Sequence, residues 1–195
     1  MDYKSWRRGD FTLHRGAQER EISYHLGEME DWTITFADTG LATNTGGRLK
    51  RIERYVKGSP FLATYGDGLS DIDLRALFEM HIANGSLATM TCVTPRTHYG
   101  IVSMDERGRI IAYDEKPQLK TWVNGGFFVF STEIFSYLGE NDTLEHDPFE
   151  RLIRDGKLQA YSHHGFWMCM DTYKDNLALN DLWDSGNPPW KVWED

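Results

Sequence analysis

The sequence predicts an α/β fold in which a mostly parallel, mixed sheet is covered by helices on both faces. Two observations lead to this class. From residue 61 onward, short runs rich in β-branched and aromatic residues alternate with stretches whose apolar residues recur at helical spacing. One run, residues 61–65, is apolar and opens into Gly66-Asp67-Gly68, as a buried parallel strand does. Strands and helices that alternate in this way pack as a sheet with helices on either side.

The first part of the chain is predicted to be mainly strands. Residues 10–14, 21–26 and 32–37 each alternate apolar and polar side chains of β-favouring types. A loop of small residues, 43–47, follows them. Apolar residues one helical turn apart then predict a helix over 48–57.

The central part contains two predicted strands around a helix. The strands are 61–65 and 87–93. Ser70 or Asp71 is expected to cap the start of the helix between them, because both side chains accept hydrogen bonds from free backbone amides. Gly85 suits the left-handed position that follows a helix.

The last part opens with a predicted hairpin, in which 100–104 and 109–113 flank the turn 105–108. The remaining predicted elements are a strand at 123–130, helices near 133–138 and 148–155, a strand at 158–163, a strand-like run at 165–167 and a helix at 173–183.

Composition excludes several classes of protein. The 195 residues, about one domain's worth, contain 21 Lys and Arg against 30 Asp and Glu, a net charge of −9. A general nucleic-acid binder would cluster Lys and Arg instead. The densest apolar run, 126–130, is far shorter than the roughly 18 residues of a membrane span. Residues 1–10 lack the apolar segment of a signal peptide.

The cysteines and tryptophans support further expectations. Cys92 and Cys169 lie far apart, which favours reduced, buried thiols and a cytoplasmic protein over a disulfide. Cys169 is interpreted as a packing residue. Trp183, Trp190 and Trp193 are interpreted as core or oligomer contacts, so the tail is compatible with a homo-oligomer.

Two aspartates follow predicted strands and suggest a metal site. Asp67 follows 61–65, and Asp171 follows 165–167. Ligands of open α/β sheets bind beyond the carboxyl ends of the strands. Mg²⁺ takes one or two carboxylates and leaves its other positions to water and phosphate. The alternatives are a simple turn for Asp67 and a helix cap for Asp171.

Five blocks occur in a fixed order before a Trp-rich tail. The blocks are Thr45-Gly46-Gly47-Arg48-Leu49-Lys50-Arg51, Thr64-Tyr65-Gly66-Asp67-Gly68, Glu115-Lys116-Pro117, Asn124-Gly125-Gly126-Phe127-Phe128 and Gly165-Phe166-Trp167 with Met170-Asp171-Thr172; the tail is Pro189-Trp190-Lys191-Val192-Trp193. Together they resemble the sugar-phosphate nucleotidyltransferases, in particular their cytidylyltransferase branch, from about Trp32 to the end. The resemblance implies a Rossmann-like nucleotide-diphospho-sugar transferase fold.

The resemblance also implies roles for the residues of these blocks. Asp67 and Asp171 would bind Mg²⁺ and, with Lys116, form the catalytic centre. Lys116 would contact the sugar phosphate beside Glu115, and Asn124 and Gly125 would bind the sugar. The nucleotide would contact Thr43, Thr45, Gly46, Gly47, Arg48 and Gly66.

Simpler interpretations stay open for these residues. Lys116 is also explained as a solvated lysine, Gly125 as a strand glycine that permits close packing, and residues 45–48 as a glycine-rich turn. The choice of cytosine is open as well, because uridylyl- and thymidylyltransferases use the same region with different residues.

The implied reaction converts CTP and α-D-glucose 1-phosphate to CDP-glucose and pyrophosphate, for deoxysugars of surface polysaccharide. The family's opening loop, Leu-Ala-Gly-Gly-x-Gly-Thr-Arg, is not found before Trp32. We therefore expect residues 1–195 to be the C-terminal portion of a single nucleotidyltransferase domain, without its first βαβ units and with impaired activity. A non-catalytic sugar-nucleotide-binding or regulatory module and a metal-dependent glycosyltransferase are the alternatives.

Overall fold

The computed structural model describes residues 10–15, 20–25, 34–56, 58 and 60–193. The chain divides into two compact units, Met1–Asp38 and Thr39–Asp195. In the first unit, β1 (Asp10–Arg15) pairs antiparallel with β2 (Arg20–His25), which confirms two predicted strands. The third, 32–37, is wrong in residues 34–37, which form no strand, and its first two residues lie outside the described residues. Alternation alone does not make a strand, since a strand also needs a hydrogen-bonded neighbour.

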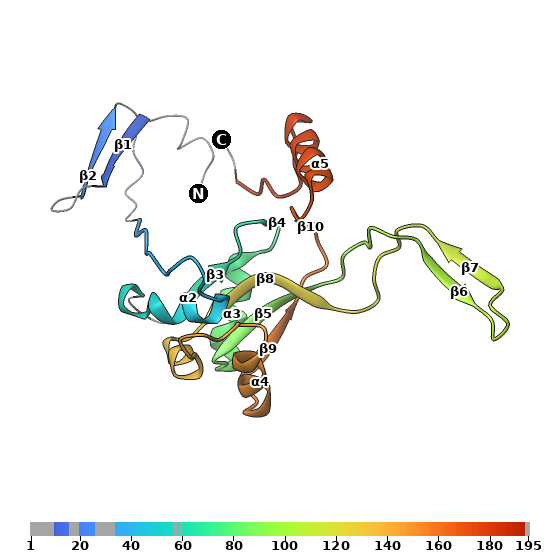
Figure 1. Ribbon diagram of the computed structural model, residues 1–195, viewed down its shortest axis with the longest axis horizontal. Helices are drawn as coiled ribbons and strands as arrows, with labels where there is room; N and C mark the ends of the chain where they lie inside the picture. Colours follow the sequence, from blue (N-terminus) through green and yellow to red (C-terminus); the bar gives the residue numbers. More distant parts are fainter. Residues whose placement is uncertain (1–9, 16–19, 26–33, 57, 59, 194–195) are drawn as a thin grey trace. The chain divides into compact units, whose positions relative to one another are not determined.

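The second unit is built on a four-stranded sheet with the order β3-β8-β5-β9. Its strands are β3 (Phe61–Thr64), β8 (Val123–Phe130), β5 (Ala88–Val93) and β9 (Leu158–Ser162). Strand β8 runs antiparallel to both of its neighbours, and β5 and β9 are parallel. Three strands therefore run one way and β8 the other, which confirms a mixed sheet, although two of its three strand pairings are antiparallel (Figure 1).

Strand β8 is buried on both faces of the sheet: its successive residues point to opposite sides, and each side packs into an apolar cluster. Phe128 and Phe130 belong to one apolar cluster and Val129 to another. The first cluster receives side chains from α2 (Thr45–Arg51), the 3₁₀ helix η2 (Thr132–Tyr137) and α4 (Asp147–Arg154). The second receives Leu77 from α3 (Leu74–Asn84). Helices on both faces are thus confirmed.

The start of α3 differs from the prediction. Asp73 caps the helix, and its Oδ1 accepts hydrogen bonds from the amides of Arg75 and Ala76 at 3.0 and 2.9 Å. Ser70 and Asp71 are not the cap, because Ser70 belongs to the short strand β4 (Gly68–Ser70). Gly85 ends the helix with a φ of +57°, as predicted.

Two further elements deviate from their predicted form. The helix expected at 48–57 begins earlier and is shorter: α2 ends at Arg51 and a 3₁₀ turn, η1 (Glu53–Tyr55), follows. Strand β3 lies at an edge of the described sheet, and Leu62 is 48% exposed, so it is not the buried parallel strand that its apolar residues suggested.

Two small pairs of strands complete the second unit. The predicted hairpin is confirmed as β6 (Ile101–Met104) and β7 (Ile110–Asp114), which projects from the sheet in Figure 1. Strand β10 (Trp167–Cys169) pairs antiparallel with β4 and leads into α5 (Tyr173–Asp184). Trp190 is 8% exposed and packs against Phe166, which makes it a core residue. Among the described helices, none has the length and apolar character that crossing a membrane requires.

Candidate active site

The pairing of β4 with β10 brings Asp67 and Asp171 together. Gly68 lies opposite Cys169 in this pair, and the amide of Met170 donates a hydrogen bond of 2.8 Å to the carbonyl of Asp67. Asp67 directly precedes one strand, and Asp171 lies two residues beyond the other. The predicted proximity of the two carboxylates is confirmed. The cause is this antiparallel pair, not neighbouring parallel strands.

Three possible metal ligands gather at this point. One ligand atom each from Asp67, Cys169 and Asp171 lies within 4.8 Å of the other two. Both aspartates are exposed, and Cys169 is partly buried. This donor set fits a divalent cation, and its two carboxylates are the oxygen ligands that Mg²⁺ prefers.

Asp171 is not used as a helix cap. The cap of α5 is Thr172, which forms a capping box with Asp175: the Thr172 hydroxyl accepts from the amide of Asp175 at 3.2 Å, and the Asp175 carboxylate accepts from the amide of Thr172 at 2.9 Å. The capping interpretation of Asp171 is therefore wrong, and its carboxylate stays with the metal-ligand cluster.

Cys169, which sequence reasoning assigned to packing, belongs to this cluster of possible metal ligands. Its Sγ lies 3.4 Å from Oδ1 of Asp171. Burial, together with the neighbouring carboxylates of Asp171 and Asp67, raises the pKa of the Cys169 thiol to about 12. The clue in the sequence was the spacing of two between Cys169 and Asp171, which puts both side chains on the same side of an extended segment.

The glycines of β8 lie against the strand that leads to Asp171. The indole Nε1 of Trp167, on β10, donates a 2.8 Å hydrogen bond to the carbonyl of Gly125. A Cβ on Gly125 would lie 3.1 Å from the carbonyl of Thr91. Close packing therefore accounts for glycine at 125, and its contact with a sugar stays a prediction. Asn124 accepts a 2.9 Å hydrogen bond from the amide of Gly126.

Glu115 and Lys116 lie at the base of the hairpin, just beyond β7. The hydroxyl of Tyr113 donates a hydrogen bond to Glu115, and this bond, with the charges of Lys116 and Lys174, lowers the pKa of Glu115. Lys174 belongs to the first turn of α5, three residues after Asp171. The base of the hairpin is thus within electrostatic range of the helix that follows Asp171.

The backbone of Lys116 is unusual. Its φ is +48°, and no other non-glycine residue in the described part of the chain has a positive φ. Such strain is retained where the surroundings require a particular direction of the chain. Its Nζ lies 3.5 Å from Oε1 of Glu115, and about half of its side chain is exposed. No described contact joins Lys116 to Asp67 or Asp171.

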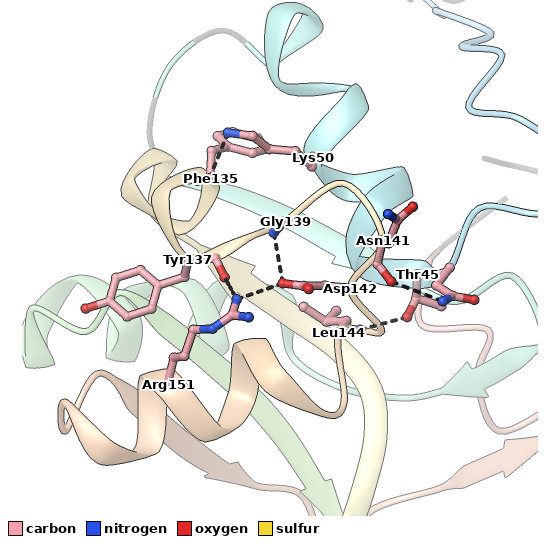
Figure 2. A network of polar contacts seen from close by, with 10 residues as sticks. Thr45, Lys50, Phe135, Tyr137, Gly139, Asn141, Asp142, Leu144 and Arg151 are labelled. Atoms are coloured by element: carbon pink, nitrogen blue, oxygen red, sulfur yellow. Dashed lines mark hydrogen bonds and ion pairs between the residues drawn. The ribbon is translucent and has the colours of Figure 1, made fainter.

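The glycines of α2 have a packing role. The amide of Gly47 donates to the carbonyl of Asp142 at 3.0 Å. A Cβ on Gly46 would lie 2.8 Å from that carbonyl, and one on Gly47 would overlap the carbonyl of Glu140. Figure 2 shows how the segment 139–144, which lies against these glycines, is held in place. Asp142 accepts hydrogen bonds from Arg151 and from the amide of Gly139, and Thr45 accepts one from the amide of Leu144.

The other predicted nucleotide ligands also make contacts within the protein. Arg48 donates to Thr39 Oγ1 at 2.9 Å and to the carbonyl of Leu41 at 3.0 Å. Thr43 donates to the carbonyl of Thr39 at 2.6 Å. Gly66 is different, because a Cβ there would meet nothing within 4 Å. Packing thus explains the loop around α2 but not Gly66, and nucleotide binding by these residues stays a prediction.

A polar link between α2 and the loop that contains Asp67 was not identified from the sequence. Glu145 accepts hydrogen bonds from the hydroxyls of both Thr45 and Tyr65. Tyr65 directly precedes Gly66-Asp67, so Glu145 connects α2 to the loop that carries Asp67. The link joins residues 80 and 100 positions apart, which no local pattern reveals.

Comparisons with known proteins agree with this description. The family model for Nucleotidyl transferase matches residues 13–195. The chain is 40% identical over 189 residues to the glucose-1-phosphate cytidylyltransferases of Salmonella typhi and Salmonella typhimurium, and the alignment covers 95% of this chain and 72% of each relative.

A solved structure, HddC from Yersinia pseudotuberculosis, matches with a TM-score of 0.54 and 20% identity. The match covers 71% of this chain and 61% of HddC, so the chain spans about three fifths of that protein. At this identity the likeness concerns the fold, and it confirms the predicted α/β class. The family model covers nearly the whole chain, and with it the predicted family is confirmed. The chain belongs to the nucleotidyl transferase family.

Proposed function

We propose that this chain transfers the cytidylyl group of CTP to α-D-glucose 1-phosphate and forms CDP-glucose and pyrophosphate. The observation that carries the proposal is the convergence of Asp67 and Asp171, which lie 104 residues apart by their numbers, at one metal-ligand cluster. The relatives that share 40% identity with the chain bear the name of this activity.

The proposed cofactor is Mg²⁺, held by Asp67 and Asp171. Two exposed carboxylates leave the remaining coordination positions to water and to phosphate oxygens, as this ion requires. When bound, Mg²⁺ supplies positive charge next to the reacting phosphates.

The proposed sugar side consists of Lys116, Glu115, Asn124 and Gly125. The Lys116 ammonium would hold the phosphate of glucose 1-phosphate, with Glu115 beside it at 3.5 Å. Asn124 and Gly125 lie on β8, which Trp167 ties to the metal-binding strand. A phosphate placed there by a cation loses freedom of motion before it reacts, which lowers the barrier.

The proposed nucleotide side consists of the loop around α2 and Gly66. The hydrogen bonds of Thr43, Thr45 and Arg48 hold this loop in shape. Gly66 leaves space in which a phosphate could approach the backbone next to Asp67.

The proposed step needs no protein nucleophile. A phosphate oxygen of glucose 1-phosphate forms a bond to the α-phosphorus of CTP, and the bond from that phosphorus to the bridging oxygen of pyrophosphate breaks. Positioning and electrostatic stabilisation account for most of the catalysis in transfers of this kind.

The test is an assay of CDP-glucose and pyrophosphate with CTP, glucose 1-phosphate and Mg²⁺. We expect Asp67→Asn and Asp171→Asn each to lower the rate by about 100-fold or more, because each removes charge that holds the cation. The matched control is Asp181→Asn, an exposed carboxylate on α5, which should leave the rate unchanged.

The same assay tests which nucleotide base the enzyme prefers and whether the chain is an enzyme or a binding protein. UTP or dTTP as the better substrate would overturn the choice of cytosine. Binding of CDP-glucose without any turnover would overturn the proposed activity and leave a non-catalytic binding protein.

A further inference from the structure

The metal-ligand cluster contains a donor that Mg²⁺ does not use. This inference rests on the proposed function, because it concerns the same cluster of Asp67, Cys169 and Asp171. The Cys169 sulfur lies 3.4 Å from Oδ1 of Asp171, and the three ligand atoms fit within 4.8 Å. A cation bridging the two carboxylates would therefore lie within reach of the sulfur.

The two kinds of donor select different cations. Carboxylate oxygens suit hard ions such as Mg²⁺, whereas thiolate sulfur suits zinc and other soft ions. Zn²⁺ accepts mixed sulfur and oxygen ligands in a tetrahedral arrangement, and catalytic zinc sites give it three protein ligands and leave the fourth position open. Two carboxylates and one thiolate would supply such a set.

The geometry is fixed by backbone pairing. Gly68 lies opposite Cys169 in the β4–β10 pair, and the Met170 amide is bonded to the Asp67 carbonyl. The three ligands come from two segments held in register, so the sulfur is brought to the carboxylates by the same contacts that join the carboxylates.

We propose that Cys169 is a thiolate ligand in this site, so that divalent cations of the zinc class bind there more tightly than Mg²⁺ and compete with it. The Cys169 proton is released to solvent when the sulfur–metal bond forms. The consequence is a transferase site that thiophilic metals can occupy in place of its proposed cofactor.

The chain carries its own control for this proposal. Its two cysteines are both free thiols. Cys92 lies on β5, and its sulfur is directed to the carbonyl of Met90 at 3.9 Å, with no carboxylate partner described for it. Replacing Cys92 therefore tests for nonspecific thiol binding at a site without the two aspartates.

The experiment titrates the full chain with CdCl₂, in the absence of substrates, and follows the ultraviolet charge-transfer band of a cadmium–thiolate bond. We expect the band in the wild type and in Cys92→Ser, and its loss in Cys169→Ser. By isothermal titration calorimetry, Cys169→Ser should weaken Cd²⁺ binding by at least about tenfold, with a much smaller effect on Mg²⁺. Asp67→Asn should weaken the binding of both ions.

Two results would overturn the proposal. One is a band that survives in Cys169→Ser and disappears in Cys92→Ser. The other is no band in the wild type at saturating Cd²⁺. A Cys169-dependent band in a protein that makes no CDP-glucose would support the metal site and contradict the proposed activity, whereas CDP-glucose synthesis without the band would do the reverse.

Discussion

Strand β8 and the β6–β7 hairpin have similarly apolar sequences and opposite surroundings. Phe128, Val129 and Phe130 of β8 are 2%, 0% and 0% exposed. Every residue of β6 and β7 is exposed, and Ile111 reaches 67%. The comparison shows that apolar side chains predict a strand in both places, but only neighbours on both sides of a strand make it a core strand.

The difference matters for the proposed site because each region carries a different part of it. Strand β8 carries Asn124 and Gly125, and Trp167 joins it by a hydrogen bond to β10, the strand that precedes Asp171. The base of the hairpin carries Glu115 and Lys116, whose described partners are mainly each other and Tyr113. Substitutions near β8 should therefore affect folding, and substitutions at the hairpin base should affect positioning of substrate.

The largest expected difference between the two regions comes from shortening one apolar side chain in each, Phe128 on β8 and Ile111 on β7. Phe128→Ala should lower the free energy of unfolding by about 3–5 kcal/mol, because it leaves a cavity among packed aromatic rings. Ile111→Ala should lower it by less than about 0.5 kcal/mol. Urea denaturation followed by circular dichroism measures both. Similar losses in the two variants would show that the hairpin is buried in solution.

A second prediction concerns the exposed base of the hairpin. Lys116→Ala should lower kcat/KM for CDP-glucose by about 100-fold, or about 2.7 kcal/mol of transition-state stabilisation. The unfolding midpoint should stay unchanged, since the Lys116 side chain is about half exposed. Lys120→Ala, an exposed lysine of the same loop, is the matched control. A drop in stability that accounts for the lost rate would contradict a positioning role for Lys116.

The smallest expected effect concerns the contribution of Asp142 to the stability of the packed segment beside α2. The pKa of Asp142 is lowered by its hydrogen bond from Arg151 and by the amide of Gly139. Its stabilisation is therefore present above the unfolded-state value of about 3.9 and is lost as the pH falls through the lower folded-state pKa. Asp142→Asn should cost about 1 kcal/mol at pH 7.

The pH dependence provides the check on Asp142. The difference between the wild type and Asp142→Asn should shrink as the pH falls below about 4 and vanish below the lowered folded-state pKa, where the wild-type carboxyl is neutral in both states. Asp181→Asn should follow the wild type throughout. If the difference in unfolding free energy between the wild type and Asp142→Asn stays constant with pH, the charge of Asp142 does not contribute to stability.

Local pattern was sufficient where an element's neighbours lie nearby in the sequence. The hairpin at 101–114 and the end of α3 at Gly85 match their predictions because a turn or a cap depends on a few adjacent residues. It was insufficient at Leu62, whose exposure depends on the position of β3 at the edge of the described sheet. The start of α3 shows that a local signal can also be ambiguous, since Asp71 and Asp73 are both suitable caps and Asp73 is the one used.

The sequence by itself determined the α/β class, the family and the pair of aspartates, because each depends on residue types in a fixed order. Only the tertiary structure decided that Cys169 joins Asp67 and Asp171, that Thr172 and not Asp171 caps α5, and that close packing requires Gly46 and Gly47. The cap of α5 is a local choice between adjacent residues, since Thr172 pairs with Asp175 three residues later. The metal-ligand cluster and the packing at Gly46 and Gly47 depend instead on backbone pairing or close approach between distant segments. Local periodicity carries no information about which distant segment lies beside a residue.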